Sequence, residues 1–351
     1  MKLLQHKVFH VSFLLPFFSL LVGISFQAES KVGVQSISID SVVSSDFAKL
    51  VSPSELRGIL SVIASDSFMG REAGQTGQKL AAVYIANFYK KEQLVKAVGD
   101  SSYFQTFTYA GTHFSAADSG ITENVVGFVK GSELSNQFVV ISAHYDHLGI
   151  KNGKLFNGAD DDGSGTSCLL AMAKAFSQAA KNGYRPKRSI VFIAFSGEEK
   201  GLLGSNYYSE HPLFPFAQTM VDLNIDMVGR HDKVHRHKKN YVYLIGSTIL
   251  SKQLDSINQK VNHRYIGLNL DYTYNSVDDP NHYYYRSDHY NFAKNKVPVI
   301  FYFNGVHEDY HKPTDKIAKI DFELMAKRAQ LIFHTAWELA NRPEGLKLVE
   351  Q

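Results

Sequence analysis

Residues 136–147 read NQFVVISAHYDH, and this stretch indicates how the chain folds. Its apolar part, FVVISA, has the length and the β-branched content of a strand and is too short for a helix of ordinary length. A continuous apolar run of this kind is typical of a strand that is buried on both faces, as in a parallel sheet. Polar residues begin at His144, where we expect the strand to end.

The segments that follow alternate between helix-like and strand-like patterns. Helices are predicted over 164–183 and 200–211, and strands over 188–199, 220–230 and 297–305. Strands that alternate with helices along the chain form parallel sheets with helices on both faces. The sequence therefore predicts an α/β fold with a largely parallel sheet.

The remaining sequence adds helices on both sides of this core. They are predicted from Pro53, from Thr76 and over 321–341, and ENVVGFVKG reads as one more strand. Residues 31–52 show no clear period and are interpreted as a lead-in segment. Because there is no internal repeat or low-complexity linker, we expect residues 31–351 to form a single domain.

The first residues, 1–30, have the pattern of a secretory signal peptide. Two lysines precede a charge-free apolar stretch, and Ala28-Glu29-Ser30 forms a small-x-small cleavage site. A membrane anchor is the alternative, but the apolar stretch contains Pro16 and is shorter than the roughly 20 residues of a spanning helix. We therefore expect a secreted or periplasmic protein with no membrane association after cleavage.

Composition excludes several classes of protein. The chain has 351 residues, 44% of them hydrophobic, and a formal net charge of +3, which is typical of a globular protein and argues against a nucleic-acid partner. Cys168 is the only cysteine, so no intramolecular disulfide can form. It lies in an apolar helical pattern with no neighbouring cation, and we interpret it as a buried structural thiol.

Imidazoles and carboxylates gather where the predicted strands end. In open α/β sheets, ligands bind beyond the carboxyl ends of the strands. A mixture of these two side-chain types suits zinc and other first-row divalent ions. The residues concerned are His144, Asp146, His147, Glu198, Glu199, Asp226, His307 and His311, together with the acidic loop GADDDGSG at 158–165.

These motifs carry a family resemblance. SAHYDHLG, NGADDDGSG, FSGEEKGLLGS, NIDMVGR, YRSDHYNF and DYHKPTD occur in an order and spacing that resemble the co-catalytic zinc aminopeptidases of metallopeptidase family twenty-eight. Glutamate carboxypeptidase, glutaminyl cyclase and the transferrin receptor have relatives in the same family. The resemblance runs from about Glu55 to Glu338. It implies a three-layer α/β/α sandwich around a mixed, largely parallel sheet, and a zinc-peptidase catalytic domain.

The resemblance also implies a ligand set for two zinc ions. His144 and Asp226 are expected to hold one ion, Glu199 and His311 the other, and Asp161 to bridge both. In this family the bridging aspartate precedes a cis peptide bond, which here falls between Asp161 and Asp162.

Further roles follow from the resemblance and from chemistry. Glu198 is expected to be the general base, and Tyr310 resembles a tyrosine that assists the oxyanion. Two ions about 3.5 to 4 Å apart can share a water, and a carboxylate that is not a ligand must accept its proton. Asp146 is expected to orient His144, and Asp288 to support another part of the site.

The stretch HEDYH, residues 307–311, matches the H-E-x-x-H signature of helical zinc peptidases. That signature needs a helix, because only there do histidines four apart share a face. Here a strand-like run precedes the stretch and Pro313 follows it closely, so no helix is expected. We interpret the match as accidental, with His311 as a ligand and His307 and Glu308 as bystanders.

The sequence thus predicts an exported metallo-aminopeptidase that hydrolyses N-terminal residues from peptides. A single-zinc glutaminyl-peptide cyclotransferase is the alternative enzyme, and a non-catalytic receptor-like scaffold is disfavoured because every ligand position and the base are filled. Many secreted relatives carry an inserted protease-associated domain, and here only a short connection joins Phe107 to Val139. We therefore expect the tyrosine-rich loop 272–290 to contribute to substrate selection.

Overall fold

The computed structural model describes residues 39–350, apart from residues 100, 112–114 and 116–117. The predicted signal peptide, residues 1–30, lies outside the described residues. Within the described part of the chain, no helix has both the length and the apolar character that crossing a membrane requires.

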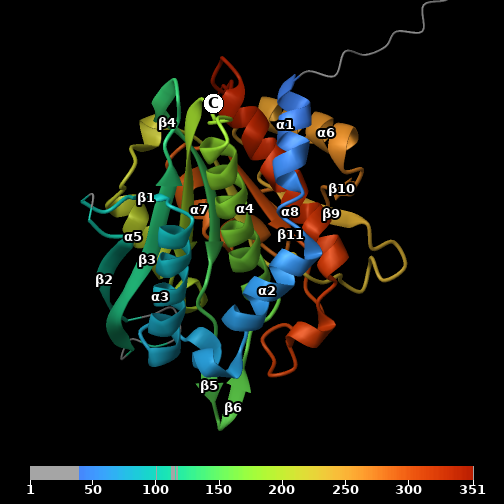
Figure 1. Cartoon of the computed structure of the whole chain (residues 1–351). Coiled ribbons are helices and arrows are strands. Elements are labelled where there is room, and N and C mark those ends of the chain that lie inside the picture. The colour runs from blue at the N-terminus through green and yellow to red at the C-terminus, as the bar shows by residue number, and fades with distance from the viewer. Residues whose placement is uncertain (1–38, 100, 112–114, 116–117, 351) are drawn as a thin grey trace, which may run out of the picture. The chain divides into compact units, whose positions relative to one another are not determined.

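A nine-stranded mixed sheet forms the centre of the fold, in the order β1-β3-β7-β4-β8-β11-β9-β10 with β2 paired to β3 (Figure 1). Its core, β7-β4-β8-β11, is parallel, whereas β3 and β9 join it antiparallel. The strands are β1 (Val95–Lys96), β2 (Phe104–Ala110), β3 (Ser119–Val129), β4 (Leu134–His144), β7 (Arg188–Phe195), β8 (Thr219–Ile225), β9 (Tyr241–Ile245), β10 (Asn269–Asp271) and β11 (Val299–Phe303). A separate hairpin, β5 (Gly149–Lys151) and β6 (Lys154–Phe156), follows β4.

Helices cover both faces of this sheet, as Figure 1 shows. Buried side chains of α1, α2, α3, α4, α6 and α8 form one apolar core with the sheet, and those of α5 and α7 belong to the other. The helices are α1 (Ile39–Ala48), α2 (Pro53–Ile63), α3 (Thr76–Lys91), α4 (Gly163–Lys181), α5 (Leu203–Glu210), α6 (Lys252–Tyr265), α7 (His289–Ala293) and α8 (Phe322–Asn341). The predicted α/β/α sandwich is confirmed.

The central strand β4 shows why the opening stretch predicted this architecture. Val139 and Ile141 pack into one core, and Val140, which lies between them, packs into the other. All three are fully buried, because helices cover the sheet on both faces. Cys168, on α4, is likewise fully buried as a free thiol, as predicted.

Helix α1 was not predicted. Its sequence, IDSVVSSDFA, is rich in serine and β-branched residues, which have modest helix propensity. The helix is instead stabilised by packing, since Val43 and Ala48 are buried and the ring of Phe47 stacks on that of Trp337 at 6.5 Å. Tertiary contacts of this kind commonly decide whether a short helix forms.

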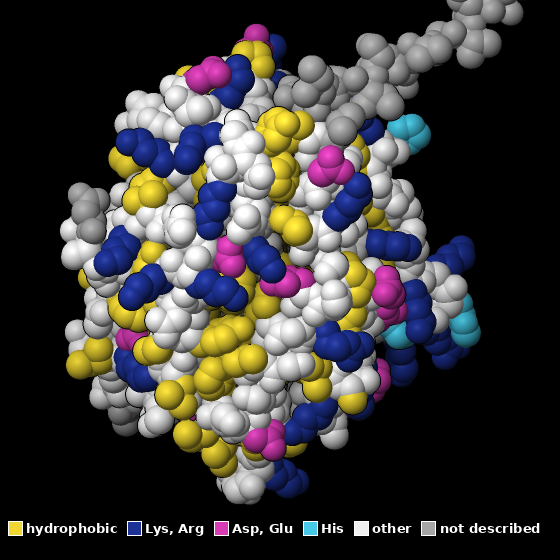
Figure 2. Space-filling model, viewed as in Figure 1, with side chains coloured by type: hydrophobic (Ala, Val, Ile, Leu, Met, Phe, Trp, Pro, Cys, Tyr) yellow, Lys and Arg dark blue, Asp and Glu magenta, His cyan; other side chains and the backbone are white. Residues whose placement is uncertain are grey.

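The described surface mixes charges of both signs. Figure 2 shows Lys and Arg side chains spread over the face that is turned to the viewer in Figure 1, with Asp and Glu among them. The polar stretch 231–240 has no helix or strand, and Lys233, Arg236, Lys238 and Lys239 are all exposed there.

Candidate active site

The predicted metal-binding side chains meet at one edge of the sheet. His144 is the last residue of β4, Asp226 follows β8 directly, and Glu199 lies in the short turn after β7. Asp161 lies in the loop before α4, and His311 in the loop after β11. Parallel strands present their carboxyl ends at the same edge, which is why residues from distant parts of the sequence come together.

One set of donors consists of His144, Asp161 and Asp226, which we call the first donor group. Nε2 of His144 lies 3.5 Å from Oδ1 of Asp161 and 3.6 Å from Oδ1 of Asp226. The hydroxyl of Ser287 donates to the other oxygen of Asp226 at 2.7 Å. All three donors are buried.

The second donor group shares Asp161 and adds Glu199 and His311. Nε2 of His311 lies 3.1 Å from Oδ2 of Asp161 and 3.1 Å from Oε2 of Glu199. A further imidazole, that of His147, lies 2.6 Å from Oε1 of Glu199 and 3.8 Å from Oδ2 of Asp161. The two oxygens of Asp161 therefore face different groups.

The loop that carries Asp161 is fixed by its neighbours. The Asp161–Asp162 peptide bond is cis, as the family resemblance predicted. The carboxylate of Asp162 caps α4 by accepting from Gly165 N at 2.9 Å, and it also accepts from Met227 N at 3.0 Å. It thereby links the start of α4 to the residue that follows Asp226.

The donor atoms fit a bound cation. Oδ2 of Asp161, Oε1 of Glu199 and both ring nitrogens of His147 are buried and make no hydrogen bond. Buried polar atoms are normally paired, and carboxylates gathered with imidazoles in this way suit zinc. Burial opposes ionisation of Asp161, yet the nearby imidazoles of His144 and His311 hold its pKa well below the ordinary value.

Glu198 adjoins both groups without belonging to either. Its Oε2 lies 3.9 Å from Nε2 of His144, and its backbone N–H donates to Oδ1 of Asp146 at 3.2 Å. Burial raises the pKa of Glu198 well above its ordinary value, while His144 opposes the rise. Asp146 also faces His144, whose Nδ1 lies 3.2 Å from the Asp146 backbone oxygen and 3.7 Å from its carboxylate.

A pocket opens over these residues. Tyr310 stacks on His311 with ring centroids 3.9 Å apart, and its hydroxyl accepts a long hydrogen bond of 3.4 Å from Arg286. Arg286 also lies over the ring of Tyr283, 5.0 Å from the ring centroid. The pocket has an acidic end and an apolar wall, and its lining is Asp161, Glu198, Asp226, Met227, Tyr283, Arg286, Phe301, Phe303, Val306, Tyr310 and His311.

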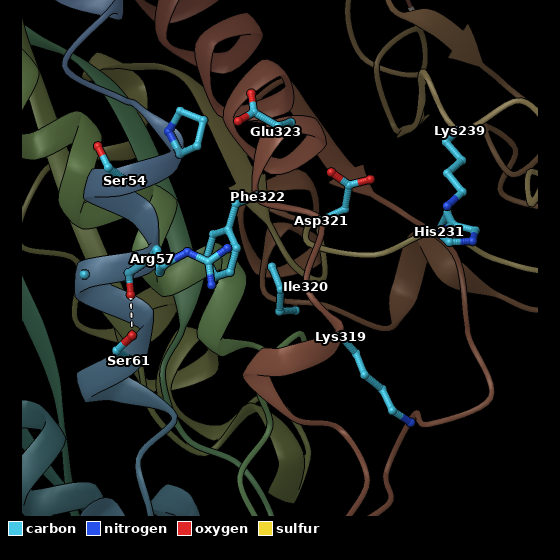
Figure 3. Close-up of a pocket in the computed structure, with 12 residues that line it drawn as sticks. Ser54, Arg57, Ser61, His231, Lys239, Lys319, Ile320, Asp321, Phe322 and Glu323 are labelled. Atoms are coloured by element: carbon cyan, nitrogen blue, oxygen red, sulfur yellow. Dashed lines mark hydrogen bonds between the residues drawn. The ribbon is translucent and has the colours of Figure 1, made fainter.

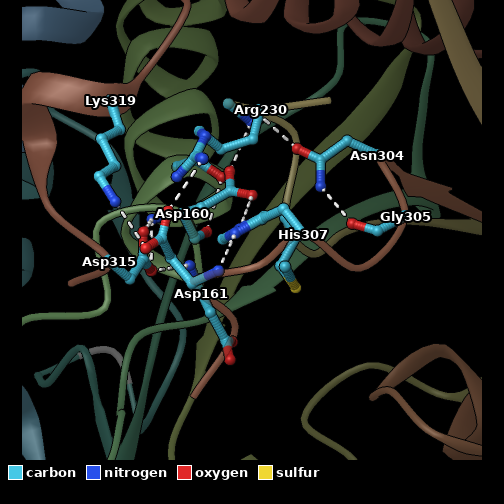
Figure 4. A network of polar contacts seen from close by, with 12 residues as sticks. Asp160, Asp161, Arg230, Asn304, Gly305, His307, Asp315 and Lys319 are labelled. Carbon is cyan, nitrogen blue, oxygen red and sulfur yellow. Dashed lines mark hydrogen bonds and ion pairs between the residues drawn. The ribbon is translucent and has the colours of Figure 1, made fainter. Parts of the chain in front are cut away.

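The HEDYH stretch is not helical, as predicted: residues 304–307 have no regular structure and 308–311 form turns. His307 is nevertheless more than a bystander. Its Nε2 lies 3.1 Å from Oδ2 of Asp160, and its Nδ1 accepts from Asp309 N at 3.2 Å (Figure 4). The pair Asp160–His307 therefore connects the loop of Asp161 to the loop of His311.

Other members of this buried network hold the same loops. Asp315 accepts from the backbone N–H groups of Asp160 and Asp161 at 2.9 and 3.2 Å. Arg230 donates to Asp309 at 3.1 Å, and Lys319 also donates to Asp309, at 2.6 Å. These contacts tie the loop of Asp161 and the loop that follows Asp226 to the loop of His311.

Arg71 holds the opposite side of the site and was not predicted from the sequence. Its side chain is fully buried and donates to the backbone oxygens of Ile63, Tyr145, Asn157 and Gly158 at 2.7 to 2.9 Å. No local pattern signals such a role, because all four acceptors are backbone groups.

Two other assignments needed the structure. His147 was noted in the sequence but given no role, although its place three residues after His144 is a usable signal. Asp288 is fully buried and hydrogen-bonds none of the predicted ligands. The neighbouring Ser287 makes that contact, to Asp226.

A second groove lies away from these residues, between α2 and the start of α8 (Figure 3). Arg57, His231, Lys239 and Lys319 line it together with acidic residues. None of the predicted site residues reaches it, so the smaller pocket over the donor groups is the candidate active site.

The fold and the paired donor groups define a metal-site protein of the α/β/α class. The model of peptidase family M28 matches residues 124–336, which is more than half of the sequence. The chain belongs to this family.

Individual relatives agree with the family assignment. Aminopeptidase YwaD of Bacillus subtilis is 36% identical over 110 residues, which are 31% of this chain and 22% of that protein. The chain thus aligns with less than a quarter of that relative's length.

Solved structures share the fold at lower identity. A zinc aminopeptidase from Bacillus subtilis, BSAP, superimposes with a TM-score of 0.66 at 17% identity, covering 84% of this chain and 96% of that one. The glutaminyl cyclase of Porphyromonas gingivalis superimposes with a TM-score of 0.61 at 17% identity, covering 81% and 97%. At such identity the likeness concerns the fold alone.

Proposed function

We propose that this protein is a zinc aminopeptidase that uses two metal ions to remove N-terminal residues from peptides. The observation that carries the proposal is the pair of donor groups that share Asp161, each with an imidazole and a second carboxylate. A shared carboxylate between two such groups favours a two-ion site over a single-zinc cyclase site.

His144, Asp161 and Asp226 would hold one zinc ion, and Asp161, Glu199 and His311 the other. Imidazole nitrogen and carboxylate oxygen are ordinary zinc ligands. When bound, zinc lowers the pKa of water and stabilises negative charge on a carbonyl oxygen.

Glu198 is proposed as the general base. It takes a proton from the attacking water and delivers it to the nitrogen of the leaving amine as the peptide bond breaks. Its largely buried side chain supports the role, because a carboxylate that is poorly solvated is a stronger base. Its position beside both donor groups, outside either, leaves its oxygens free for proton transfer.

Tyr310 is proposed to stabilise the negative charge that develops on the carbonyl oxygen, since it lines the pocket and its ring stacks on His311. The apolar wall, with Phe301, Phe303 and Val306, suits an apolar first side chain. Tyr283 and Arg286 come from the loop 272–290, which supports the expected role of that loop in selection.

Export is a separate part of the proposal. The charge-free apolar stretch and the small-x-small site within residues 1–30 support cleavage after export to the periplasm or the medium. Mass spectrometry of the protein from its native host tests this, and a mature chain that retains Met1 would contradict it.

The activity is tested with chromogenic aminoacyl substrates and the same substrates with blocked N-termini, before and after chelation. Hydrolysis of the free substrates alone, lost with the metal and restored by zinc, is expected. Cyclisation of N-terminal glutamine by a protein that binds one zinc ion and cleaves no peptide would contradict the proposal.

A further inference from the structure

His147 faces Glu199 from the end of the segment that also carries His144. It is almost fully buried, and its Nδ1 lies 2.6 Å from Oε1 of Glu199. The other oxygen of Glu199 faces His311 at 3.1 Å. The two oxygens of one carboxylate thus have two different imidazole neighbours, and neither ring nitrogen of His147 has a hydrogen-bond partner among the described residues.

The distances separate ligands from supporting groups. Two donors on one tetrahedral zinc ion, with bonds of about 2.0 to 2.2 Å, lie roughly 3.4 Å apart. The pairs formed by His311 with Glu199 and by His144 with Asp226 lie at 3.1 and 3.6 Å, close to this value. The contact of His147 with Glu199, at 2.6 Å, is much shorter and approaches the roughly 2.7 to 2.9 Å of a charge-assisted hydrogen bond.

The ring of His147 is held in place by neighbouring backbone groups. Its backbone N–H donates to the oxygen of Arg71 at 3.2 Å. Gly158 lies against the ring face, since a Cβ at that position would lie 2.5 Å from ring carbons of His147. The φ of Gly158 is +53°, a conformation that side chains disfavour, so both space and backbone require glycine there.

We propose that His147 is a positioning residue of the second donor group. Its Nδ1 lies against Oε1 of Glu199 at 2.6 Å, and this contact restrains the carboxylate so that Oε2 points to the position shared with Asp161 and His311. The proposal rests on the proposed function, which makes Glu199 a zinc ligand. Carboxylate and imidazole pairs around metal sites commonly tune affinity in this way.

Three variants test the proposal. His147→Leu keeps bulk but has no donor, and His147→Asn places an N–H at the same number of bonds from the backbone as Nδ1. The matched control is His334→Leu on α8, where an equally buried histidine contacts Ser44 and stacks on Tyr265, with no predicted ligand among these contacts. Zinc dissociation constants of the full chain are measured by competition with a chromophoric chelator.

In His147→Leu, the dissociation constant of one of the two zinc ions should rise by about 10- to 100-fold, the usual cost of losing an outer-shell partner. His147→Asn should recover most of this loss, and the control should bind zinc as the wild type does. Unchanged binding in His147→Leu would overturn the proposal. The proposal would also be overturned if His147→Asn bound zinc as weakly as His311→Ala does and showed the same change in the cobalt(II) absorption spectrum. His147 would then be a ligand.

Because the readout is metal binding, it is independent of catalysis. A wild-type protein that binds two zinc ions and cleaves no peptide would remove the proposed activity and leave the role of His147 intact. A protein that binds only one zinc ion, with a dissociation constant that neither His147 variant changes, would contradict the positioning role.

Discussion

The two donor groups share Asp161 but differ in what holds their other members. His144 and Asp226 stand at the ends of β4 and β8, which are adjacent parallel strands in the middle of the sheet. Glu199 lies in a short 3-10 helix (Glu198–Lys200) after β7, and His311 lies in a turn after β11. The side chain of His311 is 36% exposed, and its φ of +54° is uncommon for a residue with a side chain.

We call the first donor group the rigid half of the site and the second donor group the adjustable half. Sheet hydrogen bonds fix the backbone of the first group, whereas the second depends on side-chain contacts between loops. Both groups reach the pocket, through Asp226 and through His311, but the side chain of His311 is the more exposed of the two. We therefore expect the second zinc ion to exchange more readily than the first.

The largest expected effect concerns Glu198, which adjoins both groups. Glu198→Gln preserves size and hydrogen bonding but cannot accept a proton near neutral pH. General acid–base catalysis typically contributes about 10² to 10⁴ in rate, so kcat should fall by at least about 100-fold. Both zinc ions should remain bound, because Glu198 is not a ligand.

The matched variant is its neighbour, Glu199→Gln, which should lose zinc from the second group because an amide is a poorer ligand than a carboxylate. Steady-state kinetics and bound zinc are measured for both proteins. If Glu198→Gln loses zinc, or keeps more than about a tenth of wild-type turnover where a loss of roughly 10² is expected, the base is assigned to the wrong residue.

The next effect tests the rigid half against the adjustable half directly. His144→Ala should weaken zinc binding at the first group by more than the roughly 10- to 100-fold cost of losing an outer-shell partner. It should also lower the melting temperature further than His311→Ala does, because metal bound to a buried site adds to the stability of the fold. Bound zinc after dialysis and thermal melting are the measurements. The reverse order of melting temperatures would contradict the comparison.

The rigid half was the easier one to predict from the sequence. The apolar run FVVISA and the abrupt change to His144 mark both the strand and its functional end. The same pattern recurs before Asp226 and before Glu198. Strand ends of a parallel sheet meet at one edge, so the approximate position of these residues follows from the strand pattern alone.

The adjustable half depends on contacts that no local pattern encodes. His147 follows β4 and Glu199 follows β7, and the contact between their side chains can be recognised only from the distance in the folded protein. The buried side chain of Arg71 binds only backbone oxygens, which any sequence supplies. From the sequence, His307 is interpreted as a bystander because HEDYH lacks a helix, and its contact with Asp160, which is distant in sequence, is visible only in the structure.

His307 yields the third prediction, an intermediate effect. His307→Ala removes the link to Asp160 and so loosens the connection between the loops of Asp161 and His311. Zinc affinity should fall by about tenfold, the lower end of the range for outer-shell partners, and clearly less than in His311→Ala. Chelator competition measures it, with the exposed His237→Ala as control. Equal losses from His307→Ala and His311→Ala would revive a metal-binding role for both histidines of HEDYH.

The smallest expected effect concerns the pocket wall on the adjustable side. Val306 lines the pocket and is 38% exposed, so it can be replaced with little cost to the core. Val306→Asp places a carboxylate where an apolar first side chain would pack. An exposed ion pair contributes up to about 1 kcal/mol, so the ratio of kcat/KM for lysyl over leucyl substrates should rise about fivefold.

The control is Val234→Asp, at a position that is 77% exposed and outside the pocket lining, which should leave the ratio unchanged. An unchanged ratio in Val306→Asp would mean that the first side chain of the substrate does not contact this wall. Suppose instead that kcat falls for both substrates and less zinc is bound. The substitution would then have displaced the loop of His311, and zinc binding by the second donor group would depend strongly on the conformation of that loop.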